Sequence, residues 1–308
     1  MKVPFSISTS AARNVKANGE LLVNMYADQL PPNAKSQVAL IGTPGWTYRS
    51  KLGTAPIIGM HYFNGNLYVV TQTHLYKVSA DDKITTVGTL DLSATDQASI
   101  ADNGVNMVIV GGNGYYSDGS SVTKITNAAY YPSDTVIFKD GYFIFNRSNT
   151  NQFFISKLYS VDFDATMYAS AEGSPDNIVG IATDSRNVWI FGTQSTEVWY
   201  NSGDSLFPFD RVSGSFSQRG CLSYKTISSI NNTICWVADD GMVYMANGYT
   251  PQQISTPAVE YQIAKRGTKA MRAFSYTEEG HYFYVLTIDS QITLVYDMKT
   301  ALWHTRSS

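Results

Sequence analysis

The chain has 308 residues, and only 15% of them are charged, which is well below the roughly 25% of an average soluble domain. Its 22 basic and 25 acidic residues give a net charge of −3, so the composition argues against a strongly basic nucleic-acid-binding protein. No apolar run approaches the ~18 residues of a membrane-spanning helix, and the N-terminal residues lack the apolar stretch of a secretory signal.

The abundant residue types are those of β-sheets and turns. Tyrosine occurs 21 times and glycine 23 times; aromatic residues favour strands, whereas glycine favours tight turns. The two cysteines, Cys221 and Cys235, have apolar sequence neighbours. Two cysteines do not make a disulfide framework. We therefore expect buried free thiols in a protein made in a reducing cytosol.

Residues 1–45 are expected to form an extended N-terminal arm. They contain Pro31-Pro32 and the segment Gly42-Thr43-Pro44-Gly45, which interrupt any regular periodic pattern. The following residues, Trp46 to Arg49, lie just before the first repeat unit. We expect 46–51 as a candidate closing strand that pairs with the last sheet, because the terminal edge strands would otherwise stay unpaired.

An internal repeat extends over the rest of the chain, 46–308. Each unit consists of short apolar strands joined by tight turns, and the turn of the first hairpin recurs at a period of roughly 40–50 residues. Asn-Gly and Asp-Gly pairs at several of these turns are typical of two-residue hairpins between antiparallel strands. The first-hairpin turns lie near residues 64, 103, 140, 185, 231 and 279.

This repeat predicts an all-β fold, a β-propeller of about six four-stranded antiparallel blades, following the N-terminal arm. The second strand of each unit is a nearly continuous apolar run, such as Met107 to Val110. We expect these strands to lie mid-blade with both faces covered. Only Pro257 to Met271 shows a spacing compatible with a short helix.

The sequence contains no pattern that indicates catalysis, a cofactor or a metal. The four histidines, His61, His74, His281 and His304, are not at metal-ligand spacing from one another or from a cysteine. Asp239-Asp240-Gly241 lacks the alternating oxygen ligands of a calcium loop and is explained by turn formation. We therefore predict a protein that is not an enzyme and has no catalytic, cofactor-binding or metal-binding residues.

Two groups of charged residues lie in the longest stretches between expected strands. Asp162, Asp164, Glu172 and Asp176 are acidic, and a glycoside hydrolase would need such a carboxylate pair in one cleft. The other group is basic and lies near residue 265. Because partner-facing loops usually occupy such stretches, we predict a partner-docking surface that contains Asp162, Asp164, Lys265, Arg266 and Lys269.

Several segments in chain order resemble the family of phage packaged-DNA stabilisation proteins, the tail hub or nozzle of short-tailed Salmonella-type phages. The joint order of these segments carries the resemblance, because each motif alone is only moderately specific. The segments are Leu21 to Asp28, Gly42 to Gly45, Ser174 to Ile181, Val188 to Gly192, Thr196 to Tyr200, Gln218 to Cys221, Val295 to Asp297, and Trp303-His304.

The resemblance implies a β-propeller in a structural virion protein of a phage tail, assembled in the bacterial cytoplasm. It implies a homo-hexameric ring below the portal and its adaptor, with docking surfaces for the needle plug and the tailspikes. Packaged DNA would pass through the ring without specific binding, and the modest negative charge agrees with this. Family members run past 308 residues, so the chain is expected to be a truncated member or a fragment.

Two other functions fit a propeller. A glycan-binding or glycan-hydrolysing propeller would need converging carboxylates and exposed aromatic side chains in one concave site. A cellular scaffold propeller of the WD type would carry recurring Gly-His and Trp-Asp marks, whereas this sequence has a single Gly-His pair, Gly280-His281, and no Trp-Asp pair. We rank the phage tail protein first, the glycan-active propeller second and the WD-type scaffold last.

Overall fold

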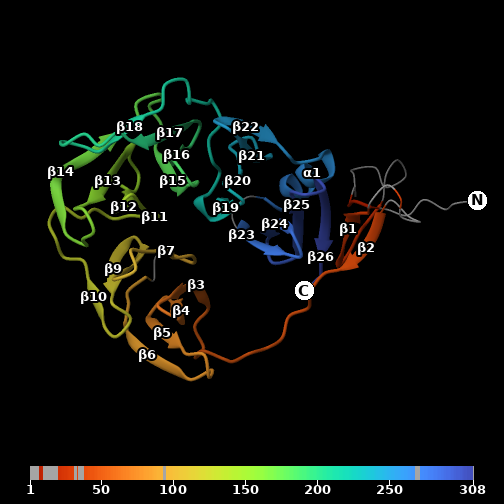
Figure 1. The fold of residues 1–308 in the computed structure, drawn as a ribbon, viewed down its shortest axis with the longest axis horizontal. Coiled ribbons are helices and arrows are strands. Elements are labelled where there is room, and N and C mark those ends of the chain that lie inside the picture. The colour runs from red at the N-terminus through yellow and green to blue at the C-terminus, as the bar shows by residue number, and fades with distance from the viewer. Residues whose placement is uncertain are drawn as a thin grey trace, which may run out of the picture. The chain divides into compact units, whose positions relative to one another are not determined.

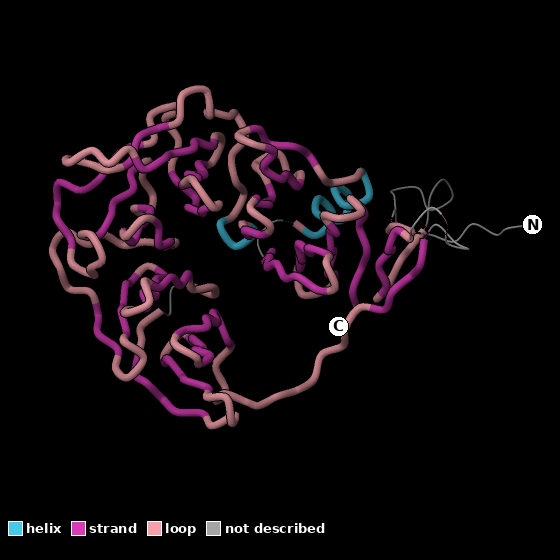
Figure 2. The backbone as a smooth tube through the Cα atoms, in the orientation of Figure 1, coloured by secondary structure: helices cyan, strands magenta, loops and turns pink. Residues whose placement is uncertain are grey.

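The computed structural model describes residues 7–9, 20–30, 33, 38–92, 95–267 and 271–307. Strands dominate these residues (Figures 1 and 2). The helical elements among them are α1 (Pro257–Arg266) and the short 3-10 helix η1 (Tyr224–Thr226). α1 confirms the expected helix and ends at Arg266, before the expected limit at Met271. No helix in the described ranges has both the length and the apolar character to cross a membrane.

The chain divides into two compact units, which are described separately. The four-blade unit comprises Tyr48–Tyr224 and holds four antiparallel sheets of four strands each. Blade one contains β3 (Ile57–Phe63), β4 (Asn66–Thr71), β5 (His74–Val78) and β6 (Ile84–Thr89); blade two contains β7 (Ser99–Asp102), β8 (Met107–Gly111), β9 (Asn113–Ser117) and β10 (Val122–Lys124). Blade three contains β11 (Val136–Lys139), β12 (Tyr142–Asn146), β13 (Gln152–Ser156) and β14 (Phe163–Ser170); blade four contains β15 (Ile178–Thr183), β16 (Val188–Gly192), β17 (Thr196–Asn201) and β18 (Phe209–Arg211).

The second strand of each of these blades is apolar because both of its faces are covered. In β8, Met107 and Ile109 pack with Leu75 of blade one. The alternate residues Val108 and Val110 belong to the cluster that contains the phenylalanines of blade three. Successive side chains of a strand point to opposite faces. A strand between two neighbouring blades is therefore apolar at every position.

Turn residues and short polar contacts set the register. Asn64-Gly65 and Asp140-Gly141 have positive φ at both positions, as two-residue hairpin turns require. Between blades two and three, the Ser99 hydroxyl accepts a hydrogen bond from Val136 N (3.0 Å) and donates one to Val136 O (3.2 Å). This pair of bonds ties the first strand of blade two to that of blade three.

Gly220 packs directly against a neighbouring main chain. A Cβ atom at this position would lie 2.4 Å from Thr193 C and Gln194 N, and backbone atoms cannot move away as a flexible side chain can. We expect Gly220→Ala to lower the free energy of unfolding by about 2 kcal/mol through overpacking. Urea unfolding would measure the change. Gly42→Ala is the control, because nothing lies within 4 Å of its Cβ position; equal losses in both variants would contradict this prediction.

The two-blade unit comprises Met1–Thr47 and Lys225–Ser308. Its two-stranded N-terminal hairpin pairs β1 (Met25–Gln29) with β2 (Val38–Gly42). Blade five contains β19 (Ser228–Ile230), β20 (Thr233–Val237), β21 (Val243–Asn247) and β22 (Thr250–Gln253). Blade six contains β23 (Met271–Glu278), β24 (His281–Ile288), β25 (Ile292–Asp297) and β26 (Leu302–Arg306).

Blade five covers one face of blade six through apolar packing and hydrogen bonds. The Tyr284 hydroxyl donates to Thr226 O (2.8 Å), and Trp303 Nε1 donates to Ile254 O (2.7 Å). Both aromatic side chains are almost fully buried. The opposite face of blade six is therefore the one available to another element, and the N-terminal hairpin contacts it.

The structure confirms the all-β fold of six four-stranded antiparallel blades, and it corrects three details. Residues 46–51 form no strand; the fourth strand of blade six is β26, which pairs with β25 directly after a turn at Thr300-Ala301. The arm is not purely extended, since it contains the β1–β2 hairpin. Asp164 lies inside β14, an outer strand, and not in a loop. The boundary between an arm at 1–45 and a propeller at 46–308 stays a prediction.

Candidate functional site

The hairpin-binding face of blade six is the candidate site. It is the face on which β24 presents His281, Phe283 and Val285, whose register partners on β23 include Tyr276 and Glu278. Alternation along β24 points Tyr284 and Leu286 toward the other face. The sequence of β24 is largely apolar and aromatic because both faces are covered, and apart from His281 it contains no histidine, lysine, arginine, aspartate or glutamate.

Tyr26 of β1 is the apolar anchor of the hairpin on this face. Its ring is 2% exposed and makes edge-on contacts with His281 (4.9 Å between centroids) and Phe283 (5.1 Å). Its hydroxyl donates a long hydrogen bond to Glu279 Oε2 (3.4 Å). Burial, reinforced by the Glu279 carboxylate, raises the pKa of Tyr26 to about 12. The phenol therefore stays protonated at neutral pH.

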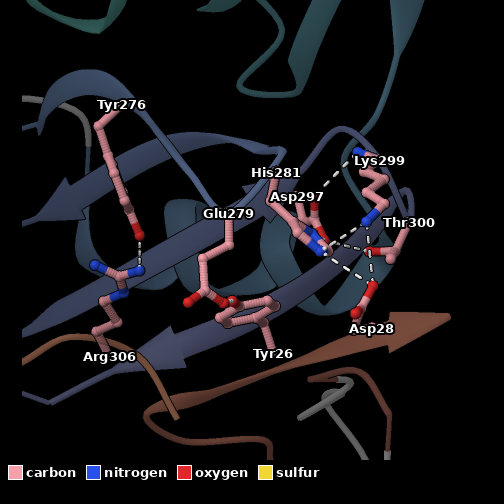
Figure 3. Close-up of polar contacts among 9 residues, drawn as sticks. All are labelled: Tyr26, Asp28, Tyr276, Glu279, His281, Asp297, Lys299, Thr300 and Arg306. Carbon is pink, nitrogen blue, oxygen red and sulfur yellow. Dashed lines mark hydrogen bonds and ion pairs between the residues drawn. The ribbon is translucent and has the colours of Figure 1, made fainter. Parts of the chain in front are cut away.

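A polar clamp beside Tyr26 joins the hairpin to blade six (Figure 3). His281 is 1% exposed, and its Nδ1 donates to Asp297 Oδ2 (2.7 Å). His281 Nε2 lies 3.2 Å from Asp28 Oδ1, and Lys299 Nζ lies 3.2 Å from both of these atoms. Asp28 belongs to β1, whereas the other three residues belong to blade six or the turn that follows β25. The clamp therefore crosses the interface.

Hydrogen bonds hold both carboxylates of the clamp. Asp297 is buried, and besides His281 it accepts from Thr300 Oγ1 (2.7 Å) and from Lys299 N (2.9 Å). Asp28 is nearer to solvent; hydrogen bonds from Lys299 and His281 lower its pKa. Since His281 Nε2 faces Asp28 and Lys299, the imidazole connects three charged side chains. This geometry suits a structural clamp that fixes the position of the hairpin.

Main-chain pairing at the edge of β26 adds to this attachment. Thr305 N donates to Leu22 O (2.8 Å), and Asn24 N donates to Thr305 O (2.9 Å). Thr9 N donates to Trp303 O (2.7 Å). Segments from the N-terminal region thus occupy part of the outer edge of blade six, and a partly covered edge is protected from pairing with other chains.

Asp28→Asn should weaken the polar clamp, because it removes the charge of residue 28 while it keeps the size of the side chain. The amide has no charge for Lys299, so we expect the hairpin to lose about 1 kcal/mol of binding free energy. Hydrogen exchange at the Asn24 and Thr305 amides would then accelerate about fivefold. Asp210→Asn, on the exposed surface of β18, is the control and should leave those rates unchanged. An Asp28→Asn rate equal to that of the wild type would contradict the prediction.

The predicted docking residues are not in this site. Asp162 forms an exposed ion pair with Lys157 (2.7 Å) and accepts from Asn127 Nδ2 (2.6 Å). These hydrogen bonds, that of Lys157 first, lower the pKa of Asp162. Asp164 accepts from Thr166 N (3.0 Å), and this bond lowers the Asp164 pKa. Both are surface groups of the four-blade unit with local partners, and their role in docking stays a prediction.

The basic residues of that prediction lie at the end of α1 in the two-blade unit. Lys265 is exposed, and its Nζ lies 5.9 Å from the centre of the Tyr261 ring. Arg266 hydrogen-bonds Gln262. Basic side chains in the last helical turn also interact favourably with the helix dipole. Lys269 lies outside the described residues. Asp162 and Asp164 are neighbours, whereas Lys265 and Arg266 belong to the other unit.

Three of the four carboxylates considered for glycoside hydrolysis, Asp162, Asp164 and Asp176, have local partners, and the fourth, Glu172, is exposed. Asp176 accepts from Gln194 N (2.7 Å), Ser195 N (3.0 Å) and Ser195 Oγ (2.7 Å), so it shapes the turn between β16 and β17. Glu197, which the sequence analysis did not single out, is buried; it accepts from Gly173 N (2.5 Å) and Trp199 Nε1 (3.0 Å). In the described part of the chain, no group of three or more His, Cys, Asp or Glu side chains could hold a metal ion.

Six meander sheets of four antiparallel strands define a β-propeller protein. The chain belongs to the packaged-DNA stabilisation family described as "Bacteriophage P22 Gp10, beta-propeller", which matches residues 1–306. It is thus a structural protein of a phage virion. A comparison with curated proteins finds no significant match.

Solved structures show the same fold at low sequence identity. The Pan2 WD40 domain of Neurospora crassa is similar, with a TM-score of 0.53 and 10% identity over 82% of this chain and 79% of that chain. BBS1N, in a complex with ARL6DN, is similar with a TM-score of 0.54 and 9% identity over 82% of each chain. The computationally designed Ika8 protein is similar with a TM-score of 0.51 and 12% identity over 91% of this chain and 82% of that chain. These likenesses concern the fold alone.

Proposed function

We propose that the chain is a tail-hub protein that retains packaged DNA in the virion. The observation that supports this most strongly is the match of residues 1–306 to the phage packaged-DNA stabilisation family. The densely paired antiparallel blades suit a stiff body that resists internal pressure, since nearly every strand is hydrogen-bonded along its length. In this role the chain acts mechanically and needs no catalytic group.

The proposed assembly is a homo-hexameric ring below the portal adaptor, with loops that dock the needle plug and the tailspikes. The net charge of −3 supports a channel through which DNA passes without specific binding. The polar clamp contributes by fixing the N-terminal hairpin on blade six. A surface presented to partner proteins is then rigid, which lowers the entropy lost on docking.

DNA retention tests this function directly. DNA-filled heads assembled without this protein should leak DNA, and added purified chain should restore protection of that DNA from nuclease. A heat-unfolded sample of the same chain is the control. If the folded chain binds to the heads but the DNA remains nuclease-sensitive, the proposed role is rejected. Measurable affinity of the isolated chain for duplex DNA at physiological salt would reject passage without binding.

A further inference from the structure

A cavity of about 280 Å³ lies in the two-blade unit, between blade six and the segment that follows β2. This volume is close to the lower end of the roughly 300–1,000 Å³ of ordinary ligand pockets, so it suits one or two side chains of a peptide. Aromatic and small residues line it, together with one cation. The lining residues are Pro44, Gly45, Trp46, Phe274, Tyr276 and Arg306.

Arg306 gives this cavity a specific chemical requirement. The residue is 9% exposed, and its guanidinium lies 5.1 Å from the centre of the Tyr276 ring. It hydrogen-bonds the Tyr276 hydroxyl (Figure 3), whereas its buried Nε has no hydrogen-bond partner. No carboxylate among the described residues forms an ion pair with Arg306. A buried cation without a counter-ion is unfavourable, so a carboxylate ligand would supply the missing partner.

The loop 202–208 has the complementary chemistry. Leu206, in this loop, is 82% exposed, the highest value among the exposed large apolar side chains of the described residues. Asp204 accepts from Leu206 N through Oδ1 (2.7 Å), which leaves its other oxygen available, and no cation in the described ranges pairs with it. The loop is closed at its base, because Ser202 N donates to Pro208 O (2.8 Å). An apolar tip beside an unpaired carboxylate is thus held in a defined conformation.

We propose that the loop 202–208 of a second copy of this chain inserts into the Arg306 cavity. Leu206 would contact Trp46 and Phe274, and Asp204 would pair with the Arg306 guanidinium. A protrusion and a pocket at different places on one chain make a heterologous contact, which generates rings or filaments when repeated. The inference rests on the proposed ring-forming function and identifies the contact that joins neighbouring copies.

The first test uses a labelled cyclic peptide of residues 201–209 as the probe. We expect saturable binding to the full chain, and at least about tenfold weaker binding to the Arg306→Gln chain, because one partner of a buried charge pair is lost. A peptide carrying Leu206→Ser or Asp204→Lys should bind at least about tenfold less tightly to the wild-type chain. Absence of saturable binding, or equal binding of all these peptides, would overturn the proposal.

The second test measures self-association of the full chain by mass photometry or light scattering. Leu206→Ser alters an exposed side chain, so the fold should persist while the association constant falls at least about tenfold. Leu158→Ser is the matched control, since Leu158 is also an exposed leucine of the four-blade unit (55%). If the Leu206 and Leu158 variants associate equally, the proposal fails.

DNA retention is scored separately, so the two proposals can fail independently. If the peptide binds the wild-type chain but DNA is not retained, the hub role is rejected and the Arg306 contact stands. If DNA is retained but the peptide does not bind, the contact is rejected and the hub role stands.

Discussion

Tyr26→Ala is expected to release the N-terminal hairpin from blade six. Tyr26 fills the apolar centre of the hairpin-binding face, where it packs with Phe283, Val285 and Val295. Truncation of a buried aromatic residue to alanine typically costs 3–5 kcal/mol. The polar clamp and the main-chain pairing at the edge of β26 would then have to hold the hairpin, and partly exposed ion pairs contribute roughly 1 kcal/mol or less.

Hydrogen exchange would measure this release at two amides. Thr305 N donates to Leu22 O, and Asn24 N donates to Thr305 O, so both amides exchange when the N-terminal segment leaves the edge of β26. A loss of about 3 kcal/mol corresponds to exchange roughly a hundredfold faster, because each 1.4 kcal/mol is a factor of ten. The Ile190 amide, inside the four-blade unit, should keep its wild-type rate.

Tyr26→Phe separates packing from hydrogen bonding. It keeps the ring and removes a hydroxyl whose bond to Glu279 is long, at 3.4 Å, so we expect exchange within about threefold of the wild-type rate. If the alanine and phenylalanine variants exchange equally fast, the ring does not anchor the hairpin and the description of Tyr26 is wrong.

The blades could be predicted from the sequence because their signals are local. An apolar run such as Met107 to Val110 between two turns identifies a strand covered on both faces, and the pairs Asn64-Gly65 and Asp140-Gly141 mark hairpins whose positive φ angles the structure confirms. The two blade strands that were not expected from the sequence, β14 and β26, have weaker signals. β14 carries polar residues on an exposed outer edge, and β26 follows β25 after a short turn without a glycine.

The candidate site could not be predicted, because its residues meet only in the fold. Asp28 and His281 are 253 positions apart, and no spacing rule connects them. The available signal for His281 is a lone histidine at the start of a largely apolar strand, and its spacing indicates only that no metal site is expected. Asp162 and Lys265 were noticed because charges concentrate in long connections, which indicates solvent exposure more strongly than function.

The hairpin-binding face combines an apolar anchor, charged partners and main-chain pairing, and these differ in how they respond to solution conditions. Packing of Tyr26 is insensitive to salt, whereas the Asp28–Lys299 pair, with its partly exposed side chains, is screened by salt. The hairpin should therefore remain bound at high ionic strength. Acid is the condition that challenges this face, because it holds the buried His304.

His304 should make the protein less stable as the pH falls below neutrality. Its ring is 2% exposed, lies 5.8 Å from the Phe283 ring, and has an Nε2 without a hydrogen-bond partner. Burial, aided by the positive charge of Arg306, lowers the pKa of His304 from 6.5 to about 3. The unfolded chain therefore binds a proton between pH 6.5 and 3 that the folded chain does not.

This difference in proton binding determines the direction in which the free energy of unfolding changes with pH. Above pH 6.5 neither state is protonated at His304 and no stability is lost, whereas below it the unfolded state gains by about 1.4 kcal/mol per pH unit. Between pH 6 and 4.5 the free energy of unfolding should fall by about 2 kcal/mol from this residue alone. The window ends at pH 4.5 because Asp28 and other carboxylates with lowered pKa values contribute at lower pH.

His304→Phe removes the titrating group and keeps an aromatic ring among Tyr26 and Phe283. In urea unfolding at pH 6 and pH 4.5, we expect this variant to lose about 2 kcal/mol less than the wild type over that interval. Leu158→Ser, which changes an exposed side chain of the four-blade unit that does not titrate, should keep the wild-type pH dependence. If His304→Phe loses stability as steeply as the wild type, another group causes the acid sensitivity.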